Sequence, residues 1–127
     1  MRPVLVPLLL LTVILPARAA VFAPLTLDEL FSRSDRVVLG EVIASEAILD
    51  EDRGRITTRH RVAVRESLKG PALTEVVVIT LGGETKDLGQ VVPGSAVLPS
   101  GVELLLCLRE GPGGAVVTGM AQGVFQV

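Results

Sequence analysis

Residues 53–70, RGRITTRHRVAVRESLKG, carry the clearest periodicity in the chain. Arginine recurs at alternate positions along one side of this stretch, while Ile56 and Val62 fall on the other side. Because successive side chains of a β-strand point to opposite faces, the alternation predicts a long strand with one buried and one solvated face. We expect this strand to run from Arg55 to Leu68 and to end at Lys69-Gly70-Pro71.

The segments before and after this strand have the composition of further strands separated by turns. The preceding run, Val37 to Leu49, is rich in Val and Ile and contains Gly40, so a long strand with a bend or bulge is expected there. A polar turn at residues 50–54 joins the two strands. Three more strands and a short extended end are predicted farther along the chain: Glu75 to Leu81, Gly101 to Arg109, Ala115 to Met120, and Val124 to Val127.

A short helix is predicted ahead of the first strand. Residues 26–29, TLDE, have the form of a capping box, in which the threonine is the N-cap and the glutamate reaches back to its amide. Leu25 and Leu30 are spaced to form a hydrophobic staple, and the helix is expected to start at about Leu27 and end at residues 32–34. One helix followed by five strands predicts a mainly β fold, either a five-stranded antiparallel barrel or a small sandwich, with a short N-terminal helix.

The start of the chain, residues 1–19, has the layout of a cleavable export signal. Arg2 supplies a positive charge, Val4 to Leu15 form an apolar run, and Ala17 and Ala19 are the small residues that a signal peptidase reads. The apolar run has roughly 12 residues, whereas a membrane-spanning helix needs about 20. We therefore expect cleavage near Ala19 and an exported protein, either periplasmic or secreted, with no transmembrane segment in the mature chain.

The predicted mature chain is a single β domain of residues 20–127. Removal of Arg2 and Arg18 leaves 10 basic residues against 14 acidic ones, so the mature net charge is −4. The single cysteine, Cys107, excludes an internal disulfide and lies in the apolar run VELLLCL, which predicts a buried thiol. An intermolecular disulfide and a catalytic thiol are the alternatives for this residue.

The alternating arginines define a candidate binding surface, which we name the arginine stripe: Arg53, Arg55, Arg59, Arg61 and Arg65. Five like charges on one side of a strand would attract an acidic protein, a polyanionic glycan or nucleic acid. The alternative is a solvated face whose arginines pair across the sheet with nearby acids: Glu41, Glu46, Asp50 and Asp52. Nucleic acid is the weakest of these partners, because single-strand binding on barrels uses aromatic platforms and the chain has no Trp or Tyr and only three Phe.

No residue pattern predicts catalysis or a bound metal. His60 has apolar and Thr neighbours on the inner side of its strand, which favours a hydrogen-bonded core or rim histidine over a metal ligand. Zinc needs three or four protein ligands, and one His, one Cys and scattered carboxylates do not supply them. We expect no enzyme activity, no cofactor and no metal site.

Residues 81–95, LGGETKDLGQVVPGS, look like a phosphate-binding loop because two glycines follow a strand. A phosphate loop leads into a helix whose amides bind the anion, but here Glu84 brings a negative charge and Pro93 would interrupt the helix. Nucleotide binding is therefore not expected. The stretch is predicted to be a long connection, either ordered on the barrel or part of a binding surface, with these candidate binding residues: Gly82, Gly83, Glu84, Lys86, Asp87 and Gly89.

The order of several phrases resembles small exported bacterial domains of unassigned function. The most specific phrases are SDRVVLGEV at residues 34–42, LKG at 68–70, LGG at 81–83 and AQGVFQV at 121–127. More distantly, the layout resembles the oligonucleotide/oligosaccharide-binding (OB) barrel of tissue inhibitors of metalloproteinases and netrin-like modules, where a serine-aspartate pair opens the first strand and a lysine-glycine pair closes the second. This resemblance implies an OB-like five-stranded barrel and suggests a protein-binding role.

The inhibitor mechanism of that family does not carry over. Those inhibitors chelate the protease zinc through a cysteine at the mature N-terminus, whereas the mature start expected here is Ala20-Val21-Phe22. The sequence predicts an exported, non-enzymatic binding module, monomeric or weakly self-associating, whose partner is another protein or an anionic envelope polymer. Two alternatives remain: a protease inhibitor or protease-associated domain that uses Gly82 to Gly94, and a polyanion-binding domain that uses the arginine stripe.

Overall fold

A computed structural model describes residues 24–86 and 88–127 of the chain. The predicted export signal at residues 1–19, the expected mature start and candidate residue Asp87 lie outside the described residues. Within the described part, the chain is mainly β and has one α-helix, α1 (Leu27–Arg33), ahead of the first strand, as expected. No helix of that part is long and apolar enough to cross a membrane.

The described residues form a six-stranded mixed sheet and a small two-stranded sheet. The main sheet has the order β1-β2-β3-β7-β6-β8. Its strands are β1 (Arg36–Asp50), β2 (Arg55–Lys69), β3 (Glu75–Leu81), β6 (Glu103–Gly111), β7 (Gly114–Val117) and β8 (Val124–Gln126). The small sheet pairs β4 (Gly83–Glu84) with β5 (Gly89–Gln90), and a 3-10 turn, η1 (Met120–Gly123), precedes β8.

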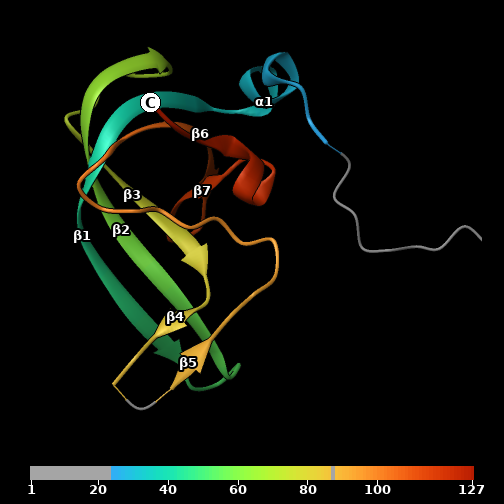
Figure 1. The fold of residues 1–127 in the computed structure, drawn as a ribbon, viewed down its shortest axis with the longest axis vertical. Helices are drawn as coiled ribbons and strands as arrows, with labels where there is room; N and C mark the ends of the chain where they lie inside the picture. Colours follow the sequence, from blue (N-terminus) through green and yellow to red (C-terminus); the bar gives the residue numbers. More distant parts are fainter. Residues whose placement is uncertain (1–23, 87) are drawn as a thin grey trace, which may run out of the picture.

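An additional pairing of β1 closes the strand order into a cycle. Besides its pairing with β2, β1 pairs with β6, so the hydrogen-bonded neighbours follow β1-β2-β3-β7-β6 and return to β1 (Figure 1). Of the five pairs in this described cycle, only β3–β7 is parallel, at Val78–Ala115 and Ile79–Val116. The expected all-antiparallel arrangement is therefore wrong. The reason is geometric, because an odd number of strands cannot alternate in direction all the way round a cycle.

The first strand is long and irregular, as its glycine predicted. The register between β1 and β2 shifts at three places, including Leu39/Gly40 and Val42/Ala44. A Cβ atom on Gly40 would lie 2.5 Å from the carbonyl oxygen of Ala63, so glycine is required for this close approach of the two strands. β1 and β2 extend together toward the β4–β5 hairpin, away from α1 (Figure 1).

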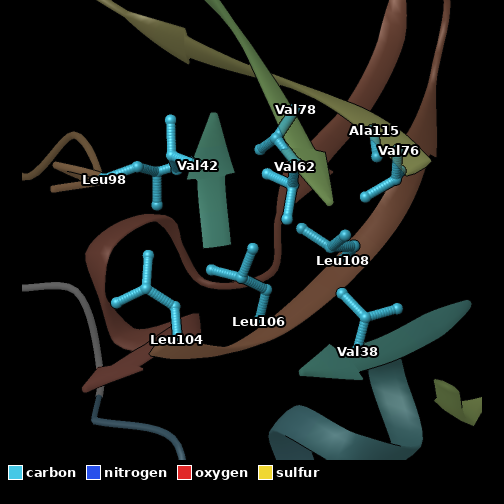
Figure 2. Packing of buried hydrophobic residues seen from close by; sticks show 10 residues of the cluster. All are labelled: Val38, Val42, Val62, Val76, Val78, Leu98, Leu104, Leu106, Leu108 and Ala115. Carbon is cyan, nitrogen blue, oxygen red and sulfur yellow. The ribbon is translucent and has the colours of Figure 1, made fainter. Parts of the chain in front are cut away.

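The hydrophobic core lies between the strands of the cycle. Its buried side chains converge from five strands and from the segment before β6 (Figure 2): Val38, Val42, Val62, Val76, Val78, Leu98, Leu104, Leu106, Leu108 and Ala115. The alternation predicted for residues 53–70 is confirmed in the first half of β2, where Ile56, His60 and Val62 are buried and the arginines between them are exposed. It is lost in the second half, where Glu66 and Leu68 on the predicted inner side are exposed.

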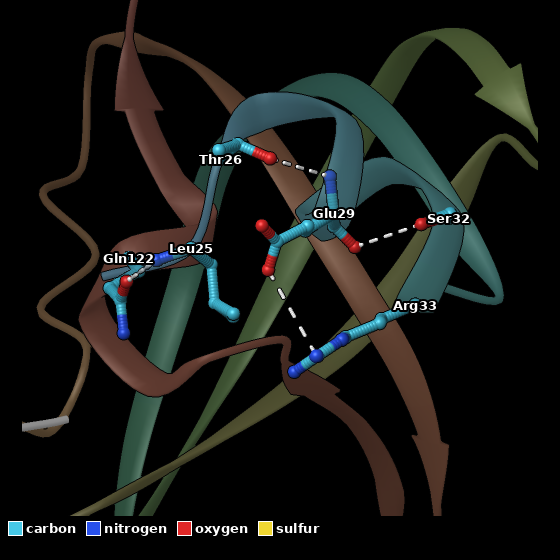
Figure 3. Close-up of polar contacts among 6 residues, drawn as sticks. All are labelled: Leu25, Thr26, Glu29, Ser32, Arg33 and Gln122. Atoms are coloured by element: carbon cyan, nitrogen blue, oxygen red, sulfur yellow. Dashed lines mark hydrogen bonds and ion pairs between the residues drawn. The ribbon is translucent and has the colours of Figure 1, made fainter. Parts of the chain in front are cut away.

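The helix begins as predicted, with one contact of the capping box replaced. Thr26 Oγ1 accepts a hydrogen bond from the amide of Glu29 at 3.1 Å, so Thr26 is the N-cap (Figure 3). The carboxylate of Glu29 faces Arg33 at 3.9 Å, one turn later, rather than the Thr26 amide. The amide of Leu25 donates to Oε1 of Gln122 at 2.7 Å, which ties the start of α1 to η1.

The last strands differ from the prediction at their ends. β6 covers Glu103–Gly111, two residues later than expected at each end, and β7 ends at Val117, three residues early. Gly119 and Met120 adopt positive φ angles of 67° and 56°, which strands do not accommodate, and the chain turns there into η1. The short extended end is confirmed as β8.

Candidate functional site

Four arginines of the stripe lie on the exposed side of β2, Arg53 lies in the turn before it, and acidic side chains face the stripe from the neighbouring strands. In the β1–β2 register, Asp50 lies opposite Arg55 and Glu46 lies opposite Arg59. The other three arginines form ion pairs: Arg53 with Asp50 at 4.0 Å, Arg61 with Glu75 at 2.7 Å, and Arg65 with Glu103 at 2.5 Å. Four carboxylates therefore accompany the five arginines, with Asp50 shared by Arg53 and Arg55, and most of the positive charge of the stripe is compensated.

The acids that face the stripe are only partly those expected from the sequence. Glu46 and Asp50 lie in the expected places across the sheet, but Glu41 lies opposite Ala63 and Asp52 lies in the turn. Instead, Glu75 on β3 forms an ion pair with Arg61, and Glu103 on β6 forms one with Arg65. These two pairings depend on which strands become neighbours in the cycle, so no local sequence pattern reveals them.

His60 is a hydrogen-bonded core residue, as predicted. It is 7% exposed, its Nδ1 lies 2.8 Å from Ser45 Oγ, and its Nε2 lies 3.0 Å from Thr80 Oγ1. Burial lowers the pKa of His60 below its ordinary value, because desolvation disfavours the charged imidazolium. Two hydroxyl groups can satisfy a neutral imidazole without adding charge. Among the residues 24–86 and 88–127, no group of three or more His, Cys, Asp or Glu is placed to hold a metal ion.

Cys107 has the buried environment that its apolar neighbours predicted. The residue has no exposed surface and is a free thiol. Burial raises the pKa of the Cys107 thiol, and a side-chain hydrogen bond with Ser34 partly offsets that rise. A protonated, inaccessible thiol is a poor nucleophile, so this environment suits packing rather than covalent chemistry.

The two glycines that resemble a phosphate loop lead into the β4–β5 hairpin and not into a helix. The Gly82 amide donates to the Ile56 carbonyl oxygen at 2.7 Å, and the Ile56 amide donates to Gln90 Oε1 at 2.8 Å. Both ends of the hairpin are thus tied to β2. Glu84 and Lys86 are exposed near its tip.

Residues 91–99 return from the hairpin toward β6 outside any strand, with a turn at Pro93 and Gly94 (Figure 1). Ser95 Oγ donates to the Leu81 carbonyl oxygen at 2.8 Å, and Ala96 and Leu98 are buried. Between them, Val97 is 80% exposed, and Val91 at the start of the segment is 91% exposed. The long connection is therefore ordered on the sheet, and it presents two apolar side chains to solvent.

Two hollows flank this segment. The first has a volume of about 250 Å³, with Thr58, His60 and Thr80 on its inner wall and Val91 and Val97 on its outer edge. The second has a volume of about 260 Å³ and lies where β3 and β7 diverge after their short parallel pairing, with these apolar lining residues: Ile79, Leu81, Val116, Val117 and Met120. Ser95 and Ala96 line both hollows and separate them.

This region lacks charge. Residues 88–102 and 111–127 contain no Asp, Glu, Lys or Arg. The described residues that line the two hollows likewise include none of these four residue types. We name this region the neutral face and define it by the two hollows and the exposed apolar side chains that line them: Leu81, Val91, Val97 and Val116.

The structure divides the described candidate residues of the connection between two places. Glu84, Lys86 and Gly89 lie on the exposed hairpin, whereas Gly82 and Gly83 line the first hollow. The signal that could have located the neutral face is the uncharged run of residues 88–102, which is unusual in a chain with 20% charged residues. Comparison with protein families, with curated proteins and with solved structures finds no match for this chain.

Proposed function

We propose that this chain is an exported, non-enzymatic binding module that docks a protein partner on the neutral face. The observation that carries this proposal is the exposure of Val91 and Val97 beside two uncharged hollows. The alternation that buries Ala96 and Leu98 must turn residue 97 outward, but it does not require that residue to be apolar. Grouped apolar side chains beside concave surfaces mark interaction sites in soluble proteins.

The proposal includes an OB-like barrel as the scaffold. The cycle of five strands, with its one parallel pair between β3 and β7, supports this assignment over a two-sheet sandwich. Export is the other part of the proposal, supported by the signal-like residues 1–19. N-terminal sequencing of the protein recovered outside the cytoplasm should read Ala20 as the first residue.

An affinity capture from the cell envelope and the culture fluid tests the binding function. The mature domain is compared with Val91→Asp/Val97→Asp, which places two carboxylates on the neutral face, and with Arg59→Glu/Arg61→Glu, which alters only the arginine stripe. We expect a partner that the first variant loses and the second retains. A partner that both variants retain, or that only the stripe variant loses, would contradict the proposal.

A protease inhibitor is the second candidate, and one observation favours it. The exposed residues 91–94 are held at both ends, by Gln90 against Ile56 and by the Gly94 carbonyl oxygen, which accepts from the Ala121 amide at 3.2 Å. A rigid exposed segment is what a protease cleft binds with little loss of conformational entropy. The purified domain at micromolar excess should then inhibit a secreted protease, and Val91→Asp should abolish inhibition.

Polyanion binding through the arginine stripe is the weaker alternative. Four carboxylates face the five arginines, and three of the arginines are in ion pairs that a phosphate or sulfate polymer would have to displace to bind. If such binding occurs, its affinity should fall steeply with salt, since exposed charges are screened within about 10 Å at 0.1 M.

A further inference from the structure

We infer that the partner that covers the neutral face is the neutral face of a second copy of this chain. The inference rests on the proposed function, because it takes the neutral face to be an interaction surface and names its occupant. Three features of the described residues support it: the shape of the face, its lack of charge and the size of its hollows.

The neutral face contains both halves of a complementary contact. Val91 and Val97 protrude from the edge of the first hollow, and the second hollow lies on the other side of Ser95 and Ala96. In the proposed dimer, a two-fold axis near Ser95 and Ala96 places the protruding valines of each copy over a hollow of the other copy. Two-fold dimers are the commonest protein oligomers because the same patch then serves on both subunits.

Charge determines which face two copies can share. The predicted mature chain carries a net charge of −4, so two copies repel one another weakly at most orientations. Charged residues are concentrated in residues 28–69, which include α1, β1 and β2, and the uncharged residues 88–102 and 111–127 build most of the neutral face. Pairing through this face therefore brings together surfaces without opposing like charges.

The size of the hollows favours protein side chains over a small-molecule ligand. Their volumes of about 250 and 260 Å³ lie below the range of about 300–1,000 Å³ that is usual for pockets that enclose small molecules. Each hollow is also open to solvent beside an exposed valine, and a facing surface can fill it with one or two apolar side chains. Three polar side chains of the first hollow are already paired, His60 with Thr80 and Thr58 with the Gly82 carbonyl oxygen.

Sedimentation equilibrium of the mature chain tests the inference. We expect the average mass to rise from one copy toward two as the concentration increases from about 1 μM to about 1 mM, a range that covers the dissociation constants of weak and moderate dimers. Val91→Asp/Val97→Asp should remain monomeric across this range. Val91→Ser/Val97→Ser, which adds no charge, should raise the dissociation constant at least about tenfold.

A matched control variant shows whether any loss of dimerisation comes from where the two carboxylates are placed or only from the added negative charge. Leu27→Asp/Leu68→Asp also replaces two exposed apolar residues with carboxylates, but on α1 and β2, and it should dimerise nearly as the wild type does. Added salt should leave the wild-type dimer intact or tighten it, because salt screens the repulsion of two acidic copies. Circular dichroism should show that all three variants are folded.

Three results would overturn the inference. They are a wild-type chain that stays monomeric at every concentration, a dimer that survives Val91→Asp/Val97→Asp, and a dimer that salt dissociates. If the chain is monomeric but affinity capture still recovers another protein whose binding depends on Val91 and Val97, the proposed function stands and this inference fails. If the chain dimerises through Val91 and Val97, the inference stands whether or not a further protein is captured.

Discussion

Gln90 anchors the β4–β5 hairpin, and with it the start of the neutral face, to β2. Its side-chain oxygen accepts a hydrogen bond from the Ile56 amide at 2.8 Å. The adjacent bond, from the Gly82 amide to the Ile56 carbonyl oxygen at 2.7 Å, holds the strand that enters the hairpin. Since Ile56 is only 3% exposed, its amide depends on the glutamine for a partner. Gln90→Ala therefore tests how strongly this single side chain fixes the hairpin.

The expected loss of stability follows from the amide that the substitution leaves unpaired. A buried donor without an acceptor costs about 1–3 kcal/mol of unfolding free energy. Gln90 lines the first hollow, from which water can reach the amide after truncation, so we expect the lower part of that range, about 1–2 kcal/mol. In a domain of this size each 1 kcal/mol lowers the Tm by about 4–8 °C, so the predicted decrease is about 5–15 °C.

Urea unfolding of the mature domain measures this loss, with Gln126→Ala as the control. Gln126 is exposed on β8, so its truncation removes the same atoms without exposing a buried amide. The m-value should stay unchanged, and hydrogen exchange should report faster opening at the Ile56 amide in Gln90→Ala. If Gln90→Ala unfolds within about 0.5 kcal/mol of the wild type and the Ile56 amide stays protected, the anchoring role is refuted.

Three further predictions concern the core, the stripe and the buried histidine. Leu106→Ala removes a side chain with no exposed surface and should lower the unfolding free energy by about 2–5 kcal/mol in urea. Arg61→Ala breaks an ion pair whose partners are about half exposed, so its unfolding free energy should change by less than about 1 kcal/mol. Because burial lowers the pKa of His60 below the unfolded-state value of about 6.5, the unfolded chain takes up the proton first as the pH falls. The contribution of His60 to stability is therefore complete above about pH 6.5 and decreases as the pH falls toward the folded pKa, and His60→Gln should remove this part of the pH dependence.

The sequence predicts the elements whose signals are local. The alternation along β2 requires only that neighbouring side chains point to opposite faces, and the N-cap at Thr26 requires only the next three residues. The parallel β3–β7 pair has no local signal in the sequence. It follows from the pairing of β6 with β1, which closes a cycle of five strands, and in such a cycle at least one pair of neighbours must run parallel. The uncharged run of residues 88–102 marks the segment, but distant contacts decide which of its side chains are exposed, so the run alone does not identify Val91 and Val97.

The phrases that carried the sequence resemblance have structural roles at the junctions of the fold. The Ser34 hydroxyl donates to the Leu30 carbonyl oxygen at the end of α1, and Asp35 Oδ2 accepts from the Glu110 amide at 2.8 Å. Lys69 Nζ donates to the Phe31 carbonyl oxygen at 2.8 Å, which satisfies the C-terminal end of the helix. The serine-aspartate and lysine-glycine pairs thus join α1, β1, β2 and β6 at one end of the sheet.

The last of these phrases, AQGVFQV at residues 121–127, also has a structural role. The side-chain oxygen of Gln122 accepts a hydrogen bond from the Leu25 amide. A Cβ atom on residue 123 would lie 2.5 Å from the Thr118 carbonyl oxygen, so glycine is required there. Neither these contacts nor those at the end of α1 involve the exposed side chains of Val91 and Val97. A chain that keeps these phrases and changes residues 88–97 is therefore expected to keep the fold and change its partner. Conversely, loss of Gly123 or Lys69 should weaken the fold before it alters what the neutral face binds.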